Sequence, residues 1–408
     1  MNEFFSLPKQ IQLGEAMRFL SIMIGSAVLP FMSMYYVSYF GTFWTGILIV
    51  VTQVAGFIAS LYGGHLSDAL GRKTVIKQGY LLSAVGWLVA IIANVPGHPL
   101  PWITFIGVFM VNIGSNYFSP AFDAMVIDMT DETNRRFVYT IGYWLINIAV
   151  MLGAGIAGLF YDQFFFELLI ALLIVEMLCY AVVIAKFGET KPEHVEFDHG
   201  HGIFDSFRNY GEVLSDKAFL TYTLGIILYG AIWAQVDNYL AVHLKLHFVP
   251  AVIFGQTITG AKMLSSAVFI NTVMIVLLMT TINRLTKSFK LAPQLILGGG
   301  LFVVGMMLAF VFNQFVPIAL TVVIYTFGEM IYVPASQVLR ADMMDEAKVG
   351  SYSGLVSMAG PVGNIIAGTM VSLSHFTGII GVEITLILLA VCGIGMMIRA
   401  AQMKQLEI

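Results

Sequence analysis

The chain has 408 residues, of which 58% are hydrophobic and only 11% are charged. About a quarter of the residues are charged in an ordinary soluble protein, so this composition excludes a soluble globular fold. The formal net charge of −4 is small, and the distribution of the charges is more informative than their sum.

Apolar segments of about 20 residues recur along the whole chain, and a segment of that length crosses a bilayer core as a helix. The predicted fold class is therefore an all-α polytopic membrane protein. No cleavable signal sequence is expected, because no small-residue cleavage site follows the first segment. Twelve transmembrane helices are predicted, at residues 17–38, 43–64, 74–94, 102–125, 137–160, 164–186, 218–241, 253–280, 292–312, 316–338, 351–373 and 379–399.

The basic residues indicate how the chain is oriented. With twelve spans, 18 of the 20 lysines and arginines fall on one side of the membrane, and only Lys245 and Lys262 do not. Because basic loops stay in the cytoplasm, both termini are predicted to be cytoplasmic. The connections on the opposite side, such as 94–101 and 313–317, are short and lack Lys and Arg.

A charged turn links the second and third predicted spans. It reads Gly64-His-Leu-Ser-Asp68-Ala-Leu-Gly71-Arg72-Lys73, with a carboxylate, a glycine and two cations where a bare connector would need only polarity. A degenerate copy, Asn283-Arg-Leu-Thr-Lys287, follows 215 residues later.

A second set of residues repeats at nearly the same offset. Pro120, Asp128, Asp131 and Glu132 recur 214 residues later as Pro334, Asp342, Asp345 and Glu346. We therefore predict two pseudo-symmetric six-helix bundles, at 1–187 and 218–408, joined by a polar cytoplasmic linker at 188–217. Duplicated halves of this kind are typical of transporters whose substrate site lies between the halves.

The twelve spans, the repeat and the 64–73 turn resemble the major facilitator superfamily. The segments Asn94-Val-Pro-Gly-His98, Met279 to Lys287, Gln235-Val-Asp237-Asn238 and Tyr325-Thr-Phe-Gly-Glu329 look like LmrP-type multidrug exporters of Gram-positive bacteria. This resemblance implies proton-coupled export of lipophilic, often cationic compounds by alternating access. It also implies that the 64–73 turn is a latch for one conformational state, in which Asp68, held by Arg72, lies against the start of the eleventh span near Gly350 and Ser351.

Ionisable residues inside membrane spans are costly and are functional candidates by default. Asp237 and Glu329 are the leading candidates for proton coupling or substrate binding, since burial in an apolar segment disfavours the charged form. Lys262 either pairs with a neighbouring acid or snorkels outward, and pairing is the expected state. Asp123 and Asp128 lie near the end of the fourth span but not on one helical face, and Glu176 is either protonatable or a helix-packing group. Each of these acids also has a structural alternative, as a hydrogen-bonding group between helices.

Aromatic residues near the expected cavity are Tyr35, Tyr36, Tyr143, Trp144, Trp233 and Tyr239, although lipid-facing aromatics are common. The sequence departs from LmrP-type exporters at two places. Gly153-Ala-Gly155-Ile-Ala-Gly158 lacks a proline, and Gly142 stands where an acid is expected beside Tyr143 and Trp144.

No phosphate-binding loop, metal-ligand cluster or nucleophile arrangement is present in the sequence, so neither an enzyme nor a cofactor is expected. His199 and His201 are expected to be solvated linker residues. Expected partners are small lipophilic substrates, protons and membrane lipids, with no nucleic acid and a monomeric state. The alternatives are a carrier of the same superfamily for a sugar, lipid or metabolite, and a signalling protein without transport.

Overall fold

The computed structural model describes residues 4, 7–131, 134–191, 215–253, 255–344, 352 and 355–405. Predictions that concern His199, His201, Glu132, Asp345, Glu346, Gly350 and Ser351 lie outside these residues.

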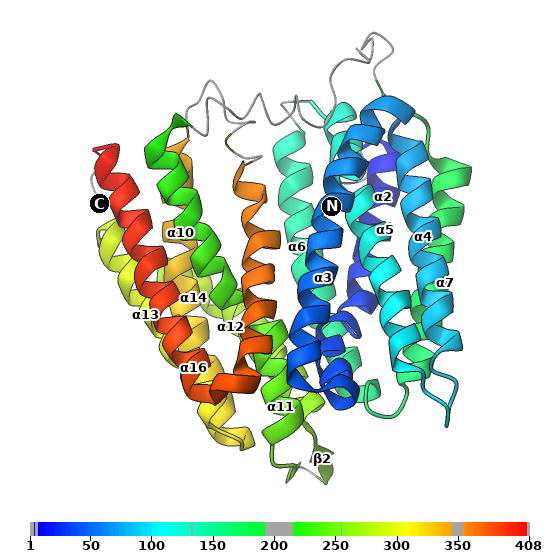
Figure 1. Ribbon diagram of the computed structural model, residues 1–408. Coiled ribbons are helices and arrows are strands. Elements are labelled where there is room, and N and C mark those ends of the chain that lie inside the picture. Colours follow the sequence, from blue (N-terminus) through cyan, green and yellow to red (C-terminus); the bar gives the residue numbers. More distant parts are fainter. Residues whose placement is uncertain are drawn as a thin grey trace. The chain divides into compact units, whose positions relative to one another are not determined.

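The described part of the chain is helical apart from short connections and one small hairpin (Figure 1). The first half contains α2 (Lys9–Gly25), the 3₁₀ turn η1 (Leu29–Phe31), α3 (Met32–Leu70), α4 (Arg72–Ile92), α5 (Pro101–Asp128), α6 (Arg135–Phe160) and α7 (Phe165–Lys186). The second half contains α10 (Lys217–Trp233), the π-helical turn η2 (Val236–Leu240), α11 (Ala241–His247), β1 (Ala251–Ile253), β2 (Gln256–Ile258), α12 (Gly260–Thr286), α13 (Leu291–Val311), α14 (Phe315–Met343) and α16 (Ala359–Met403).

Within the described ranges, nine helical segments are long and apolar enough to cross a membrane. Two of them, Lys9–Leu70 and Leu355–Met403, have 62 and 49 residues and each covers two of the predicted spans. Non-helical glycines divide them, Gly41 in α3 with φ 72° and Gly378 in α16 with φ 63°. The 28-residue helix α5, which contains Asn112 and Asn116, is not among the nine. Polytopic membrane helices are thus confirmed.

Many large apolar side chains on these helices are exposed, which suits contact with lipid. Leu277, Ile380 and Val391 have 69%, 71% and 67% of their surface exposed. Side chains of this kind on a water-facing surface would form apolar patches that soluble monomers rarely show.

The helices form two compact units. The N-terminal unit comprises Met1–Leu29 and Val54–Ile203, and the C-terminal unit comprises Pro30–Gln53 and Phe204–Ile408. The first part of α3 therefore belongs with the C-terminal unit, whereas the predicted boundary between the halves lies at residue 187.

In the N-terminal unit, α4 packs against α5 and α7, and α2 packs against α6 and α7 (Figure 1). Glycines allow the close approach of α4 and α5, because a Cβ atom on Gly86 would lie 2.6 Å from the carbonyl oxygen of Gly107. Small residues at such crossings are typical of membrane helix pairs. Buried Tyr80 and Phe122 lie in the core of this unit.

In the C-terminal unit, α14 packs against α13 and α12, and α10 packs against α16. The α13–α14 crossing again uses glycines, with a Cβ on Gly298 placed 2.6 Å from the backbone nitrogen of Tyr332. Pro334 lies in α14 at the same place, counted from the first residue of the helix, as Pro120 in α5. The internal repeat seen in the sequence thus has a structural counterpart.

The predicted span at 253–280 is wrong at its start. Residues 251–258 form the antiparallel hairpin β1–β2, with Gly255 in its turn at φ 75°, and α12 begins only at Gly260. The Thr259 side chain caps this helix by accepting a hydrogen bond of 3.2 Å from the Lys262 N–H group. Because hairpin and helix are both apolar, hydropathy alone does not separate them.

Candidate functional site

Asp237 lies in a local irregularity of the seventh predicted span. The helix changes there from α10 through the π-helical turn η2 to α11, and such turns are frequent at functional sites. Asp237 is exposed, whereas the adjacent Asn238, Tyr239 and Leu240 are buried. The π-helical turn thus gives Asp237 an accessible surface, although protein atoms surround the residue.

The backbone around Asp237 is held by a residue from the other end of the chain. The Ser33 hydroxyl donates a hydrogen bond of 3.1 Å to the Asp237 carbonyl oxygen. Asn238 donates through its side chain to the Ala234 carbonyl at 2.6 Å. These bonds fix the π-helical turn, and with it the position from which the carboxyl group projects.

Glu329 lies on α14 and is half-buried. Its carboxylate oxygen accepts a hydrogen bond of 2.7 Å from the Asn271 side chain on α12. Asn271 also donates to the Thr326 hydroxyl at 3.1 Å, one turn before Glu329. Glu329 is thus anchored by a neighbouring helix, through a residue that the sequence alone did not single out.

Tyr325 links the two acids. It is buried, and both Asp237 and Glu329 interact with it electrostatically. Its ring lies 5.6 Å from that of Phe302, which in turn lies 5.4 Å from the Trp233 ring. Carboxyl groups and aromatic rings therefore share one region of the C-terminal unit.

A stacked tyrosine pair extends this aromatic cluster. The rings of Tyr229 and Tyr332 lie 4.0 Å apart and nearly parallel, and Glu329 interacts electrostatically with Tyr229. The Tyr229 hydroxyl donates to the Gly299 carbonyl at 3.3 Å. Aromatic faces attract organic cations, and a carboxylate nearby strengthens that attraction.

Lys262 does not pair with an acid as expected. It lies in the first turn of α12, and its ammonium group donates a hydrogen bond of 3.0 Å to the Thr257 carbonyl oxygen on β2. No carboxylate lies within ion-pair distance of Lys262 among the described residues. The helix begins later than predicted, so this lysine lies at the helix end.

Asp123 and Asp128 have separate partners, in agreement with their placement off one helical face. Asp123 is exposed and lies 4.0 Å from the Arg18 guanidinium of α2. The Asp128 side chain is only 16% exposed and accepts a 3.2 Å hydrogen bond from Arg72 Nε.

The 64–73 turn forms a network of charges at one end of the N-terminal unit. Arg72 also donates to Asp68, whose side chain is 57% exposed. Gly71 has φ 94°, a conformation that favours glycine, and it directly precedes α4. The contact expected between Asp68 and the start of the eleventh span lies outside the described residues.

Glu189 completes this network, and the sequence alone did not predict it. Its two carboxylate oxygens accept hydrogen bonds from the backbone N–H groups of Arg72, at 2.8 Å, and Lys73, at 3.2 Å. A carboxylate is favoured at a helix N-terminus by the free N–H groups and the helix dipole. The start of the predicted linker therefore caps α4.

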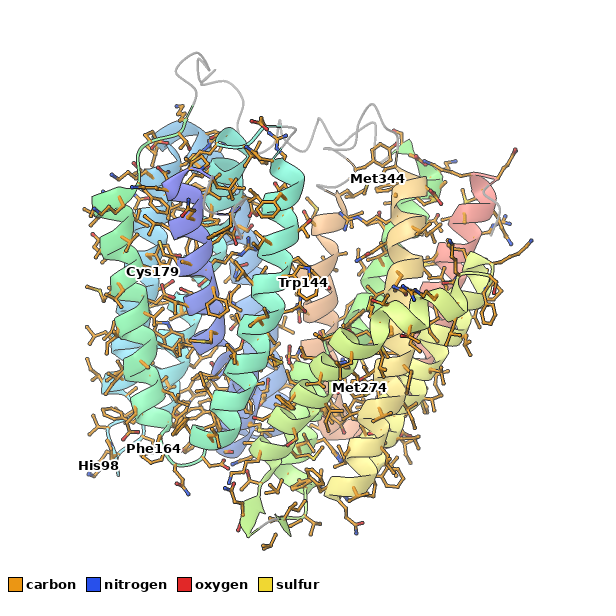
Figure 2. All side chains as sticks on the ribbon, turned by 180° about the vertical axis from the view of Figure 1, so that it is seen from behind. His98, Trp144, Phe164, Cys179, Met274 and Met344 are labelled. Atoms are coloured by element: carbon orange, nitrogen blue, oxygen red, sulfur yellow. The ribbon has the colours of Figure 1, made fainter. Side chains whose placement is uncertain are left out.

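Of the six predicted aromatic residues, two lie in the N-terminal unit and four in the C-terminal unit. Tyr143 and Trp144 lie on α6 in the N-terminal unit and are 61% and 56% exposed (Trp144 in Figure 2). Tyr35, Tyr36 and Tyr239 are buried in the C-terminal unit. Trp233 belongs to the aromatic cluster beside Glu329, through Phe302 and Tyr325.

Further acids lie in both units, buried in the N-terminal unit and half-buried at Glu383 in the C-terminal unit. Glu176 of α7 is buried and interacts with Tyr80 and with Cys179, which lies on the same helix (Figure 2). Glu15 of α2 is 3% exposed, and Glu383 of α16 interacts with Tyr239. The sequence does not single out Glu15, because this residue precedes the first predicted span. Among the described residues, no group of three or more His, Cys, Asp or Glu side chains is placed to hold a metal ion.

A family model described as Major Facilitator Superfamily matches residues 16–368. The chain belongs to the major facilitator superfamily. A Na⁺, Li⁺, K⁺/H⁺ antiporter of Planococcus maritimus is 24% identical over 364 residues, which cover 86% of each chain. The multidrug resistance protein MdtH of Citrobacter koseri is 23% identical over 346 residues, which cover 83% of this chain and 80% of MdtH.

Solved structures show the same fold. A POT family transporter in complex with 5-aminolevulinic acid has a TM-score of 0.71 at 17% identity, covering 96% of this chain and 95% of that one. A mutant of the nucleoside transporter NupG has a TM-score of 0.69 at 13% identity, covering 96% and 99%. The chain is thus a multi-pass membrane transporter and not an enzyme, and the two relatives named above are bacterial.

Proposed function

We propose that this transporter is a proton-coupled antiporter that exports lipophilic, often cationic compounds by alternating access, as LmrP-type exporters do. In this proposal twelve spans form two six-helix halves joined by the linker, and both termini are cytoplasmic. The carrier acts as a monomer in the bacterial plasma membrane, without a cofactor.

The observation that carries the proposal is the grouping of Asp237, Glu329 and aromatic rings around Tyr325. Ionisable residues in membrane spans mark ion and proton pathways. Aromatic rings beside an acid suit a flat lipophilic cation, which the ring faces and the carboxylate attract together. The relatives named as an antiporter and as a multidrug resistance protein agree with this proposal.

In the proposed cycle, substrate and proton compete for the same carboxyl groups. A cationic substrate stabilises the ionised acids, and protonation from outside weakens its binding and releases it. Loss of the proton to the cytoplasm then resets the site. Asn271 supports the ionised form of Glu329, because a hydrogen bond to a charged acceptor is stronger than one to a neutral acceptor.

A second candidate function is exchange of metal cations for protons. It is favoured by the name of the Planococcus maritimus relative, which covers 86% of this chain. Carboxylate oxygens suit small cations as well as protons, so the same two acids would serve both functions. A carrier of another solute, such as a sugar, lipid or metabolite, is the remaining alternative.

Purified transporter in proteoliposomes separates these functions. Vesicles with an acidic lumen and an internal pH dye receive, in turn, ethidium, NaCl, KCl or LiCl. The proposal predicts loss of luminal protons with ethidium and no proton loss with the three salts. Proton loss with the salts alone would favour metal-cation exchange, and no response to any addition would contradict both antiport functions.

Substitutions connect the response to the site. Glu329→Gln is expected to abolish ethidium-driven proton loss, and Asn271→Leu to reduce it. Glu167→Gln, at an exposed acid in the first turn of α7, serves as the matched control and is expected to behave as wild type. Equal activity of Glu329→Gln and Glu167→Gln would exclude Glu329 from coupling.

A further inference from the structure

Glu15 is a buried acid that the proposed cycle does not use. Its residue surface is 3% exposed, and its Oε2 atom has no hydrogen-bond partner among the described residues. This oxygen faces the backbone of Gly142 on α6, where an added Cβ atom would lie 3.3 Å from it. The carboxyl group of α2 thus occupies the space into which a side chain at position 142 would project.

The charged neighbours of Glu15 come from two helices. Arg18 lies on the next turn of α2 and Asp123 comes from α5, and both interact electrostatically with Glu15. From α6 the glycine backbone at 142 faces the acid. The acid of α7, Glu176, interacts with Tyr80 and Cys179.

The Arg18–Asp123 pair connects this buried group to the surface. The two side chains are 39% and 56% exposed and lie 4.0 Å apart. Arg18 and Asp123 carry opposite charges, so their electrostatic effects on the buried Glu15 carboxyl group partly cancel. The exposed Asp123 carboxylate offers a route between water and the buried carboxyl group.

A purely structural carboxyl group would be expected to have donors on its buried oxygens. Buried polar atoms in proteins are nearly always hydrogen-bonded, and one that is not needs a specific explanation. A proton on Oε2 provides that explanation, because it removes the charge from an oxygen that no donor stabilises. Glu176 Oε2 also lacks a partner among the described residues, but of these two acids Glu15 is the one with charged neighbours, Arg18 and Asp123.

We propose that Glu15 is a second proton-binding site of this carrier, and that it exchanges protons with solvent through the Arg18–Asp123 pair. On binding, a proton passes from water by way of Asp123 to the Glu15 carboxylate and forms an O–H bond. On release the same bond breaks and the proton returns to water. The coupling of this proton to transport rests on the function proposed above.

Infrared difference spectroscopy tests the site without any substrate. Reconstituted wild-type protein, stepped between acidic and alkaline buffer, should show a carboxylic C=O band that Glu15→Gln removes. The double variant Glu15→Ala/Gly142→Glu vacates this space from α2, places a carboxyl group in it from α6 and should restore a titrating band. Glu15→Ala/Gly142→Gln has the same shape without the acid and should not.

Counting protons per substrate in proteoliposomes tests the coupling. Glu15→Gln is expected to move one proton fewer per substrate than wild type, and the Gly142→Glu double variant to regain it. A band that persists in Glu15→Gln, or an unchanged proton count, would overturn the inference. If wild type shows the Glu15 band but no proton-driven transport, the proposed function fails and the proton site stands.

Discussion

Arg72 is the residue on which the charges of the 64–73 turn converge. Its guanidinium group donates to Asp68 and Asp128, and its backbone N–H donates to Glu189. The two aspartates differ in environment, because the Asp128 side chain is 16% exposed and that of Asp68 is 57% exposed. An ion pair screened by solvent contributes little to stability, whereas a shielded one contributes more.

We therefore expect Asp128→Asn to destabilise the protein more than Asp68→Asn. A hydrogen bond to a charged group is worth about 1.5–3 kcal/mol, which is the loss expected at Asp128. The loss at Asp68 should be about 0.2–1 kcal/mol. Chemical unfolding of both variants in the same detergent measures the two values, and an equal loss at the two positions would contradict this ranking.

At the scale of the element, the segment after α7 acts as the N-terminal cap of α4. Glu189→Ala removes the acceptor of two backbone N–H groups, and loss of a cap costs about 1 kcal/mol. Amide hydrogen exchange at Arg72 and Lys73 should then become roughly fivefold to tenfold faster. Glu189→Gln, which keeps an acceptor oxygen, should give an intermediate rate, and unchanged exchange in Glu189→Ala would show that the cap is unimportant.

Asp216 caps the following half in a similar way. Its carboxylate accepts a hydrogen bond of 2.9 Å from the Phe219 N–H group and one of 3.1 Å from the Tyr352 hydroxyl. The carboxylate also lies 3.4 Å from the Lys404 ammonium group. Burial raises the pKa of Asp216, but these hydrogen bonds and the lysine outweigh it and hold the pKa below the ordinary value of 3.8.

A carboxylate with a lowered pKa stabilises the fold at pH values above the unfolded-state pKa. That stability is lost as the pH falls through the folded-state pKa, below 3.8. Asp216→Asn should therefore be less stable than wild type at pH 7, and the difference should shrink as the pH falls below 3.8. Thermal unfolding of both proteins across this range measures the difference, and a constant gap would contradict the assignment.

At the scale of the whole molecule, hydropathy predicts the long helices well and the interactions between them not at all. The predicted span at 74–94 agrees with α4 within two residues at each end, because length and apolar content decide such a segment. The contact between Asn271 and Glu329 joins residues 58 positions apart, and no local pattern encodes it.

Two local errors of the sequence-based prediction have physical causes. Residues 253–258, which belong to the hairpin, are predicted as part of a helix because apolar strands and apolar helices have the same hydropathy. Glu15 falls outside the predicted spans because the polar residues Lys9 to Gln12 hide the true start of α2. The first error misses a whole element, the hairpin, whereas the second concerns only the boundary of a helix.

The orientation of the chain is a prediction at this scale. Single cysteines introduced near either terminus, in a background without Cys179 and Cys392, should react with a membrane-impermeant maleimide only in inside-out vesicles. This follows from the 18 basic residues assigned to the cytoplasmic side. Labelling of either terminus in intact cells would contradict it.

The central claim is that Asp237 couples proton movement to export. Proteoliposomes with an acidic lumen and no other ion gradient should take up ethidium with wild-type protein and with Glu167→Gln. With Asp237→Asn, uptake should fall to the level of protein-free liposomes, while the amount of reconstituted protein stays the same. Uptake by Asp237→Asn at the wild-type rate, with the same dependence on the pH gradient, would contradict the account.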